Sequence, residues 1–566
     1  MNKKKLLIVI LILVVLSCLL FIFIDKDNSK VTEGVDSIDI NIDPDNGDEN
    51  IDWGKYETTN IDLNKSITIN DGGIYIITGI INDGLIRVDT EEEVKLILNN
   101  ISIKNSSGPA IYIENANDVV IELLDGTNNY LEDGKNYTDY EIDVIGTIYS
   151  HDDITFEGNG SLEIVSNNED AIVGKDDLKI VSGTYKITSA DDGIRGKDSV
   201  YIKNGNFTIN STGDGIKSTN DTDSEKGFIL IENGEFDITS TLDGISSSTK
   251  LLIEDGTFNI TSGDGSKNVS TSDFWGHWGS SNNENSKSAK GIKSGDNLVI
   301  KNGSFILDTS DDAIHCNNYV GIKNGSISIT SGDDGIHADS ELIIDGGTIN
   351  MTKSYEGLEA AKVTINNGNI NVISTDDGIN IAGGNDSSAN NRPGSNNYSQ
   401  NSDNILTING GNIYVNASGD GIDVNGNAYI NGGNIKVYGP VNNANGTLDY
   451  DGIFEVNGGT LIAGGSSGML KGCSSSSKIY STTVVFNSTY SSEDIITIVD
   501  SSNKEIISYK SNKSFSALVV ASPDLKKGET YKIKVNDREY ESFTISNITT
   551  TIGNYGAGGK GNRPND

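Results

Sequence analysis

Short runs of alternating apolar and polar residues recur through the middle of the chain, each interrupted by an Asn-Gly, Asp-Gly or Gly-Gly pair. Residues 200–212 read VYIKNGNFTINST, residues 251–263 read LLIEDGTFNITSG and residues 342–354 read LIIDGGTINMTKS. Alternation with many β-branched side chains predicts β-strands, and the dipeptide by itself would suggest a hairpin. We reject the hairpin because the same sequence pattern repeats with a period longer than that of a two-stranded hairpin.

That period is about 22 residues. It is clearest at an acidic cluster, as in SADDGIRGKD (189–198), whose second acid serves as a marker: Asp170, Asp192 and Asp214 are 22 residues apart, as are Asp312 and Asp334. The extra residues between some repeats fall in Ser-, Asn- and Gly-rich tracts. A fixed period with insertions confined to such tracts indicates a repeat architecture.

A repeat of this length with three short strands matches one coil of a parallel β-helix, in which coils stack at roughly 4.8 Å. We therefore predict an all-β fold with a β-helix over residues 56–472. The isoleucine of each Asp-Gly-Ile is expected to point inward and stack on its counterparts. Asn and Asp at the corners should form ladders, and the glycine after the acid should adopt a positive φ.

The two ends of the chain differ from this body. Lys3 to Lys5 precede an apolar run, residues 6–24, which is long enough to span a bilayer. Residues 1–24 are thus predicted to be a transmembrane signal-anchor, with the protein in the cell membrane as a single-pass protein and the body extracellular. A lipoprotein site at Cys18 is the alternative. The remaining predicted segments are an acidic, solvated linker (25–55), a C-terminal antiparallel β cap domain (473–550) and a disordered tail (551–566).

The composition narrows the range of partners. The net charge of -39 makes nucleic acid and anionic lipid headgroups poor partners unless cations intervene. The three cysteines, Cys18, Cys316 and Cys473, are too few and too scattered for a disulfide framework. No Cys/His cluster indicates zinc. A monomer is expected.

Stacking places the acids of successive coils above one another, where two like charges repel by roughly 3 kcal/mol. Raised pKa values, nearby cations such as Arg195, Lys197 and Lys217, or a divalent cation would relieve this repulsion. Oxygen-rich columns suit Ca²⁺, which accepts six to eight oxygen ligands. The candidate calcium ligands are the acids of two columns: Asp170, Asp191, Asp192, Asp214, Asp311, Asp312, Asp333, Asp334, Asp376 and Asp377.

The order of these motifs, DDLKI, DDGIRGKDSVYIKNG, GDGIKS, SAKGIKSGDNLVIKNG, DDAIH, DDGIHAD, SYEGLEAAKVTINNG and DDGIN, resembles a bacterial carbohydrate-binding β-helix family. Its members look like right-handed parallel β-helices that hold calcium and bind cellulose or polygalacturonate-like polysaccharides. They are similar to family 9 polysaccharide lyases, in which an Asp-Asp-Gly cluster holds the catalytic calcium. The resemblance covers the chain from about residue 95 to the C-terminal β region. It implies calcium as cofactor and a polysaccharide as partner.

Groups that bind or act on a sugar are sought among aromatic and basic residues. The insertion at 266–290 holds Phe274, Trp275 and Trp278, whose rings can stack on sugars; burial of the loop on the solenoid wall is the alternative. Arg195 and Lys197 are further candidates for carbohydrate binding.

Two kinds of residue bear on catalysis. His315 and His337 stand one period apart and are expected to form a stacked ladder rather than a hydrolytic site. A lyase needs a strong base beside calcium, and Arg195, Lys197, Lys217 and Lys293 recur too regularly to single out a catalyst. We therefore expect a non-catalytic, calcium-dependent carbohydrate-binding protein. A polyuronate (pectate) lyase is the alternative, and a structural spacer or adhesin is a third.

Overall fold

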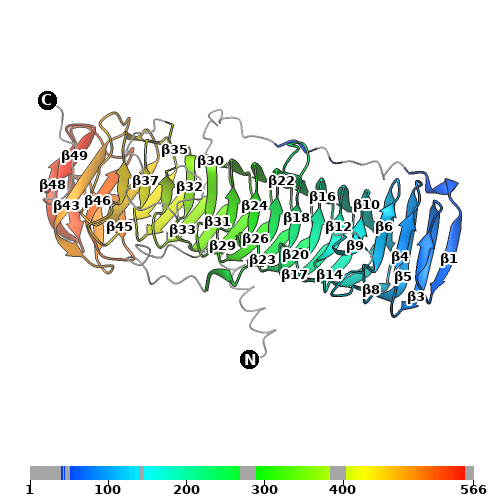
Figure 1. The fold of residues 1–566 in the computed structure, drawn as a ribbon. Coiled ribbons are helices and arrows are strands. Elements are labelled where there is room, and N and C mark those ends of the chain that lie inside the picture. Colours follow the sequence, from blue (N-terminus) through cyan, green and yellow to red (C-terminus); the bar gives the residue numbers. More distant parts are fainter. Residues whose placement is uncertain are drawn as a thin grey trace. The chain divides into compact units, whose positions relative to one another are not determined.

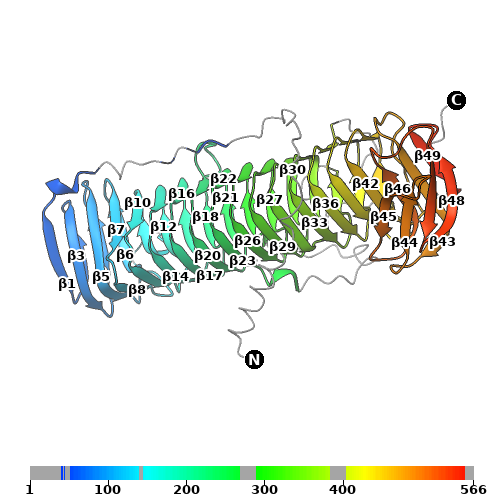
Figure 2. The same cartoon turned by 180° about the vertical axis from the view of Figure 1, so that it is seen from behind.

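The computed structural model describes residues 40–42, 44, 51–138, 140, 144–267, 288–382 and 403–554. These residues belong to one compact unit, residues 38–566. Within it, coils of short strands stack one upon another in chain order (Figures 1 and 2). The described helical segments are two short 3-10 turns, η2 (Trp53–Lys55) and η3 (Gly265–Lys267). The fold is all-β, as predicted.

Each typical coil contributes three strands, and each strand pairs in parallel with the strand of the same type one coil later. We call the three resulting surfaces faces A, B and C. The first coils are built from β1 (Thr58–Leu63), β2 (Ile67–Ile69), β3 (Gly73–Ile81) and β5 (Val94–Lys104). The long strand β5 pairs with both β7 (Val119–Leu123) and β8 (Asn128–Glu132). This parallel order, strand n on strand n+3, is that of a β-helix-like solenoid, and it excludes the hairpins that the dipeptides alone suggest.

Face A holds the strands that follow the acidic clusters: β4 (Ile86–Asp89), β6 (Ile111–Asn115), β9 (Gly146–Ser150), β12 (Asp170–Gly174), β15 (Ile194–Gly196), β18 (Ile216–Ser218), β21 (Ile245–Ser247), β24 (Ile292–Ser294), β27 (Ile314–Cys316), the starts of β30 (Ile336–Ile344) and β32 (Leu358–Ile365), β34 (Ile379–Ile381), β37 (Ile422–Val424) and β40 (Leu448–Tyr450).

Face B holds the second strand of each coil: β7 (Val119–Leu123), β10 (Ile154–Glu157), β13 (Asp177–Ile180), β16 (Ser199–Ile202), β19 (Phe228–Ile231), β22 (Lys250–Ile253), β25 (Asn297–Ile300), β28 (Tyr319–Ile322), the ends of β30 and β32, β35 (Ile405–Ile408), β38 (Asn427–Ile430) and β41 (Phe454–Val456).

Face C holds the third strand of each coil: β8 (Asn128–Glu132), β11 (Ser161–Val165), β14 (Thr184–Ser189), β17 (Asn206–Ser211), β20 (Glu235–Ser240), β23 (Thr257–Ser262), β26 (Ser304–Thr309), β29 (Ser326–Ser331), β31 (Thr348–Lys353), β33 (Asn369–Ser374), β36 (Asn412–Ala417), β39 (Asn434–Tyr438) and β42 (Thr460–Gly465).

The core consists of identical residues stacked along the solenoid. Ile194 pairs in register with Ile216, and both are fully buried. On face C, Phe236 and Phe258 stack with ring centroids 4.7 Å apart. At one corner the Asn409 amide donates to Asn366 at 2.8 Å. The inward isoleucine stack and the asparagine ladders are confirmed, and both fix the register because each residue packs only on its own counterpart.

The glycine that follows each acid has a different role from the one predicted. Gly215 does not have a positive φ. Instead, a Cβ at Gly215 would lie 2.5 Å from the carbonyl oxygen of Gly244 on the next coil. Glycine is needed there because two backbones approach closely. Positive φ values occur instead at the glycine of the turn before each face C strand, as at Gly303 with φ 127°.

An antiparallel β region follows the last coil. β46 (Phe515–Ala521) pairs antiparallel with β42 and with β43 (Ser481–Tyr490), and β49 (Thr549–Ile552) pairs with β43. A second sheet has the order β45 (Glu505–Lys510), β44 (Ile495–Val499), β47 (Thr530–Val535) and β48 (Arg538–Thr544). The last solenoid strand is thereby covered rather than left as an open edge. The predicted boundaries of this domain remain predictions.

Two findings concern the predictions for the N-terminal segments, the transmembrane anchor and the solvated linker. Among the described residues, no helix is long and apolar enough to cross a membrane, and residues 6–24 lie outside them. This finding corrects the expected single-pass localisation. In the predicted solvated linker, Ile40 is buried against Tyr201, Leu230 and Leu252. At that point the acidic segment packs on an apolar stripe formed by the outer side of face B.

Candidate functional site

A ladder of carboxylates precedes face A and belongs to the backbone structure itself. Oδ1 of Asp170 accepts the backbone N–H of Asp192 at 2.9 Å, and Oδ1 of Asp192 accepts that of Asp214 at 2.8 Å. The pattern continues as Asp312 accepts the N–H of Asp334 at 3.0 Å. In these coils one carboxylate oxygen binds the next coil, which leaves Oδ2 to be neutralised by other groups.

A second column lies three residues after the acid, in the register of face A. Its side chains follow one another coil by coil, and their charge changes sign along the solenoid. The members, in order from Val173, are Val173, Arg195, Lys217, Ser246, Lys293, His315, His337, Glu359, Asn380, Asp423 and Asp449. We call this the partner column, since it lies beside the acid ladder.

In the earlier coils the partner column is basic and neutralises the ladder. Arg195 Nη1 lies 3.2 Å from Oδ2 of Asp170, and Lys217 Nζ lies 2.7 Å from Oδ2 of Asp214. Burial raises the pKa of Asp170 to about 7, with a further contribution from Asp192, and Arg195 opposes both. These acids already have protein cations beside them.

Lys290 and His315 do the same in the middle coils. Lys290 takes the ladder position where other coils have an acid, and its Nζ lies 2.8 Å from Asp312 and 3.1 Å from Asp311. Nδ1 of His315 lies 2.8 Å from Oδ2 of Asp312. Burial opposes ionisation of Asp312, but Lys290 and His315 outweigh it and hold its pKa below the usual range.

In the later coils acid lies beside acid. The carboxylate oxygens of Asp377, Asp420 and Asp423 lie within 4.8 Å of one another. Burial, followed by the neighbouring carboxylates, raises the pKa of Asp423 to about 7, and burial raises that of Asp420 to about 7. Within the described part of the chain, none of these three forms an ion pair with lysine or arginine. Lys471 lies nearby and partly opposes both shifts, but its Nζ pairs with Asp449 at 2.5 Å. Here the ladder acids therefore have no lysine or arginine paired with them directly.

Asn380 adds an oxygen to these coils. It is buried, in register between Glu359 and Asp423, and its Nδ2 donates to Oε2 of Glu356 at 2.7 Å. Its Oδ1 is buried and accepts no hydrogen bond from any described residue. An amide oxygen beside several carboxylates is a typical calcium ligand, and a buried acceptor left unsatisfied has a cost of about 1–3 kcal/mol.

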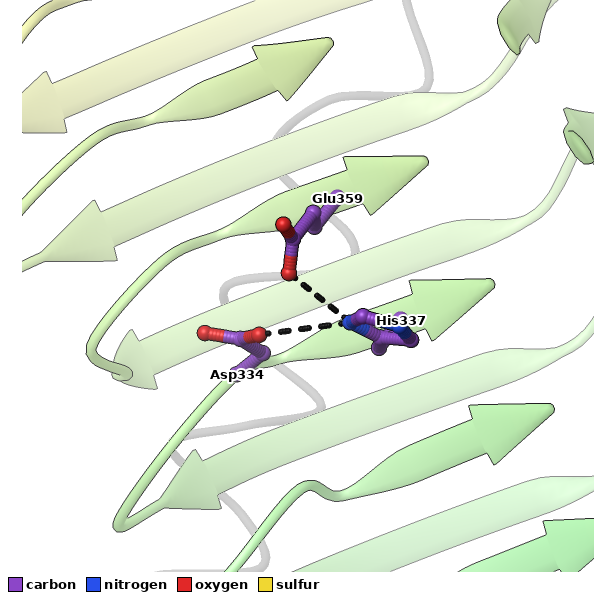
Figure 3. Close-up of side chains that lie close together, drawn as sticks. All are labelled: Asp334, His337 and Glu359. Carbon is purple, nitrogen blue, oxygen red and sulfur yellow. Dashed lines mark hydrogen bonds and ion pairs between the residues drawn. The ribbon is translucent and has the colours of Figure 1, made fainter. Parts of the chain in front are cut away.

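A separate group with a nitrogen ligand lies one coil before these acids (Figure 3). Nδ1 of His337 lies 2.8 Å from Oε2 of Glu359 and 3.5 Å from Oδ2 of Asp334. Its Nε2 lies 3.0 Å from Oδ1 of Asp339. The rings of His337 and His315 stack with centroids 4.9 Å apart, so the predicted histidine ladder is confirmed.

Tyr355 is an exposed aromatic residue beside the acids. It takes the place of the first acid in its coil. Its backbone N–H donates to the backbone carbonyl of Asp333 at 2.8 Å, and its own carbonyl accepts the backbone N–H of Asp376 at 2.9 Å. The residue is 47% exposed, and burial together with the neighbouring Asp376 raises the pKa of its hydroxyl. An accessible ring is thereby fixed next to the acidic coils.

Of the residues predicted to bind carbohydrate, some lie outside the described part of the chain and two lie within it. Phe274, Trp275 and Trp278 lie outside the described residues. Arg195 serves as a counter-charge to the ladder, and Lys197 is exposed on the turn after β15.

The predicted calcium ligands fall into several groups in space. Asp170, Asp191 and Asp192 form one group and Asp311, Asp312 and Asp333 another, each with a cation nearby; Asp214 pairs with Lys217, Asp334 joins His337, Asp376 contacts Tyr355 and Asp377 joins Asp420 and Asp423.

Two features escaped the sequence analysis. Asp153, Asp176 and Asp177 form a further carboxylate group, and burial raises the pKa of Asp153 to about 7. The available signal was the repeated text HDDI (151–154) and KDDL (175–178). Asp420 and Asp423 were also missed as ligands, although DGID follows the same pattern as DGIR and DGIK.

Comparison with known proteins identifies relatives of this chain. A family model described as "Carbohydrate-binding domain-containing protein" matches residues 63–335 and 334–537. A protein with that same description from Acetivibrio thermocellus is 36% identical over 145 residues, 24% of this chain and 51% of that protein. The chain thus spans about half the length of this relative. A solved structure, the gadolinium derivative of a polysaccharide lyase-like protein from C. thermocellum, shares 26% identity over 51% of this chain and 88% of that chain, with a TM-score of 0.32.

Proposed function

Because the chain belongs to the carbohydrate-binding domain-containing family, we propose that it is a calcium-dependent, non-catalytic binder of acidic plant cell-wall polysaccharide. The observation that supports the calcium site is the unpaired carboxylate group of Asp377, Asp420 and Asp423. In the earlier coils lysine or arginine occupies the equivalent place, and here none does among the described residues.

Calcium fits this group by its chemistry. It prefers six to eight oxygen ligands from carboxylates, amide oxygens and water. Three carboxylates together with Oδ1 of Asn380 supply such oxygens, and the half-buried position leaves room for ligands from outside the protein. We propose these four residues as the principal calcium ligands. Among the other predicted ligands, Asp170, Asp192, Asp214 and Asp312 already have protein cations and are weaker candidates.

An acidic polysaccharide is the proposed partner. A protein with a net charge of -39 repels a polyuronate unless a cation bridges the two. A calcium ion with an open position can bind a uronate carboxylate. Tyr355 offers a ring on which a pyranose can stack beside that ion, through dispersion and C–H contacts.

The test is a titration of the purified protein with polygalacturonate in calcium and in chelator, with cellulose as the uncharged comparison. We expect polygalacturonate affinity to fall about tenfold or more in chelator. Tyr355→Ala should weaken binding about fivefold, whereas the matched control Tyr355→Phe keeps the ring and should bind normally. Equal binding with and without calcium contradicts the proposal.

The same titration separates the alternatives. A lyase releases unsaturated products that absorb in the ultraviolet. Because the protein is proposed to be non-catalytic, we expect this absorbance to stay flat. A steady rise would establish polyuronate lyase activity instead. Failure to bind either polysaccharide would leave the spacer or adhesin function.

A further inference from the structure

The His337 group differs from the calcium group in having a nitrogen ligand and a fixed ring orientation. Nε2 of His337 faces a carboxylate oxygen of Asp339 at 3.0 Å. An ionised carboxylate only accepts hydrogen bonds, so Nε2 carries a proton and donates it. A histidine whose far nitrogen donates to a carboxylate is typical of metal-binding histidines, because this contact sets the tautomer and raises ligand basicity.

The other nitrogen of the ring points at two carboxylates. Nδ1 lies 2.8 Å from Glu359 and 3.5 Å from Asp334. A single proton on Nδ1 can be directed at only one of these oxygens. Three carboxyl groups, those of Asp334, Asp339 and Glu359, therefore surround a single imidazole.

The distances suit a small tetrahedral ion. Ligands about 2.1 Å from such an ion lie about 3.4 Å from one another. The separation of 3.5 Å between Nδ1 and Asp334 matches this value, and the hydrogen bond of 2.8 Å between Nδ1 and Glu359 has to widen when an ion enters. Asp334 uses Oδ1 to accept the N–H of Glu356 at 3.1 Å, so its Oδ2 remains for the ion. All three residues are more than nine-tenths buried.

His315 provides an internal comparison one coil earlier. Its Nδ1 also faces a carboxylate, but Asp312 is already paired with Lys290 at 2.8 Å. Its Nε2 lies 3.0 Å from the amide oxygen of Asn317 rather than from a carboxylate. In contrast, within the described residues neither Asp334 nor Glu359 forms an ion pair with lysine or arginine. The stacked rings therefore differ in the charge that surrounds them.

From this geometry we propose that Asp334, His337 and Glu359 form a binding site for a divalent transition metal ion of the zinc class. One nitrogen and two carboxylate oxygens select such an ion over calcium, which prefers oxygen ligands alone. The ion joins two successive coils, because Asp334 and His337 come from one and Glu359 from the next. A tetrahedral ion retains one further position. This site is independent of the proposed calcium site and of polysaccharide binding.

The experiment is a titration of the chelator-treated full-length protein with Co²⁺, a spectroscopic substitute for Zn²⁺. We expect visible absorption bands of a tetrahedral Co²⁺ centre that Zn²⁺ abolishes and a large excess of Ca²⁺ leaves unchanged. His337→Gln should lower Zn²⁺ affinity by about 100-fold or more. The matched variant His315→Gln should retain the bands.

Three results would overturn the proposal, two of them from the Co²⁺ titration and His337 and one from Glu359→Gln. The first is that Co²⁺ binds His337→Gln and the parent protein equally. The second is the absence of bands together with ¹⁵N-histidine spectra showing both ring nitrogens of His337 protonated at neutral pH. Glu359→Gln, with circular dichroism of each variant, guards against a folding defect: a folded Glu359→Gln protein that keeps full Zn²⁺ affinity would also contradict the site.

Discussion

Replacing Asp423 by asparagine should stabilise the protein without calcium and remove its response to calcium. The pKa of Asp423 is raised to about 7 by burial and by Asp420. The difference from its ordinary value corresponds to about 4 kcal/mol at neutral pH, and solvent screening of a half-buried group lowers this to roughly 2 kcal/mol. No hydrogen bond to the Asp423 side chain is found among the described residues, so the neutral isostere breaks no ladder contact.

The assay is thermal unfolding in chelator and in calcium. Unfolding of about 500 residues has an entropy of about 1 kcal/mol/K, so 2 kcal/mol raises Tm by about 2 °C in chelator. Calcium at a hundred times its Kd stabilises the parent by ~2.7 kcal/mol, or about 3 °C. Asp423→Asn should lose most of that increase.

The control replaces a ladder acid that has a protein cation. Asp243 lies 3.3 Å from Lys293 and accepts the N–H of Lys290 at 2.8 Å. Asp243→Asn leaves Lys293 without its partner and should lower stability by about 1–3 kcal/mol in both media. If Asp423→Asn destabilises the chelated protein as much as Asp243→Asn does, the reasoning about unpaired charge is refuted.

Two further predictions concern protons. In chelator, stability should fall as pH rises from about 5 to about 8, because Asp420 and Asp423 have raised pKa values near 7 and the folded state binds more protons than the unfolded state in this window; unfolding midpoints at several pH values measure this, and a rise would contradict it. Burial raises the pKa of both Cys316 and Cys473 to about 12, so a thiol reagent at neutral pH should label neither until the protein unfolds; rapid labelling of either in the native protein would contradict that.

The 22-residue period was sufficient to predict the solenoid, the inward isoleucines and the corner ladders. Because the coils stack, residues at equivalent positions of successive sequence repeats contact one another in the structure. The acid ladder followed from the same logic. Its structural role did not, because the hydrogen bond from Asp192 N–H to Asp170 depends on how closely adjacent coils approach.

The position of the unpaired acids could also be predicted in part from the sequence. The residue after each isoleucine or leucine runs from arginine and lysine through histidine to glutamate and aspartate, as in DGIR, DGIH and DGID. The distances between side chains of coils that are separated by an insertion could not be predicted from the sequence. Residues 377 and 420 are 43 apart in the chain, yet Asp420 N–H lies 2.5 Å from Asp377 Oδ1. The packing of Ile40 on face B follows no repeat at all.

The most direct test of the account is anomalous diffraction from crystals of the protein grown with calcium. The predicted result is a calcium peak among Asp377, Asp420 and Asp423, with oxygen distances of about 2.3–2.6 Å, and none beside Asp192 and Asp214, where Arg195 and Lys217 already balance the charge. Calcium beside those paired acids, or an empty Asp377 group at saturating calcium, would contradict it.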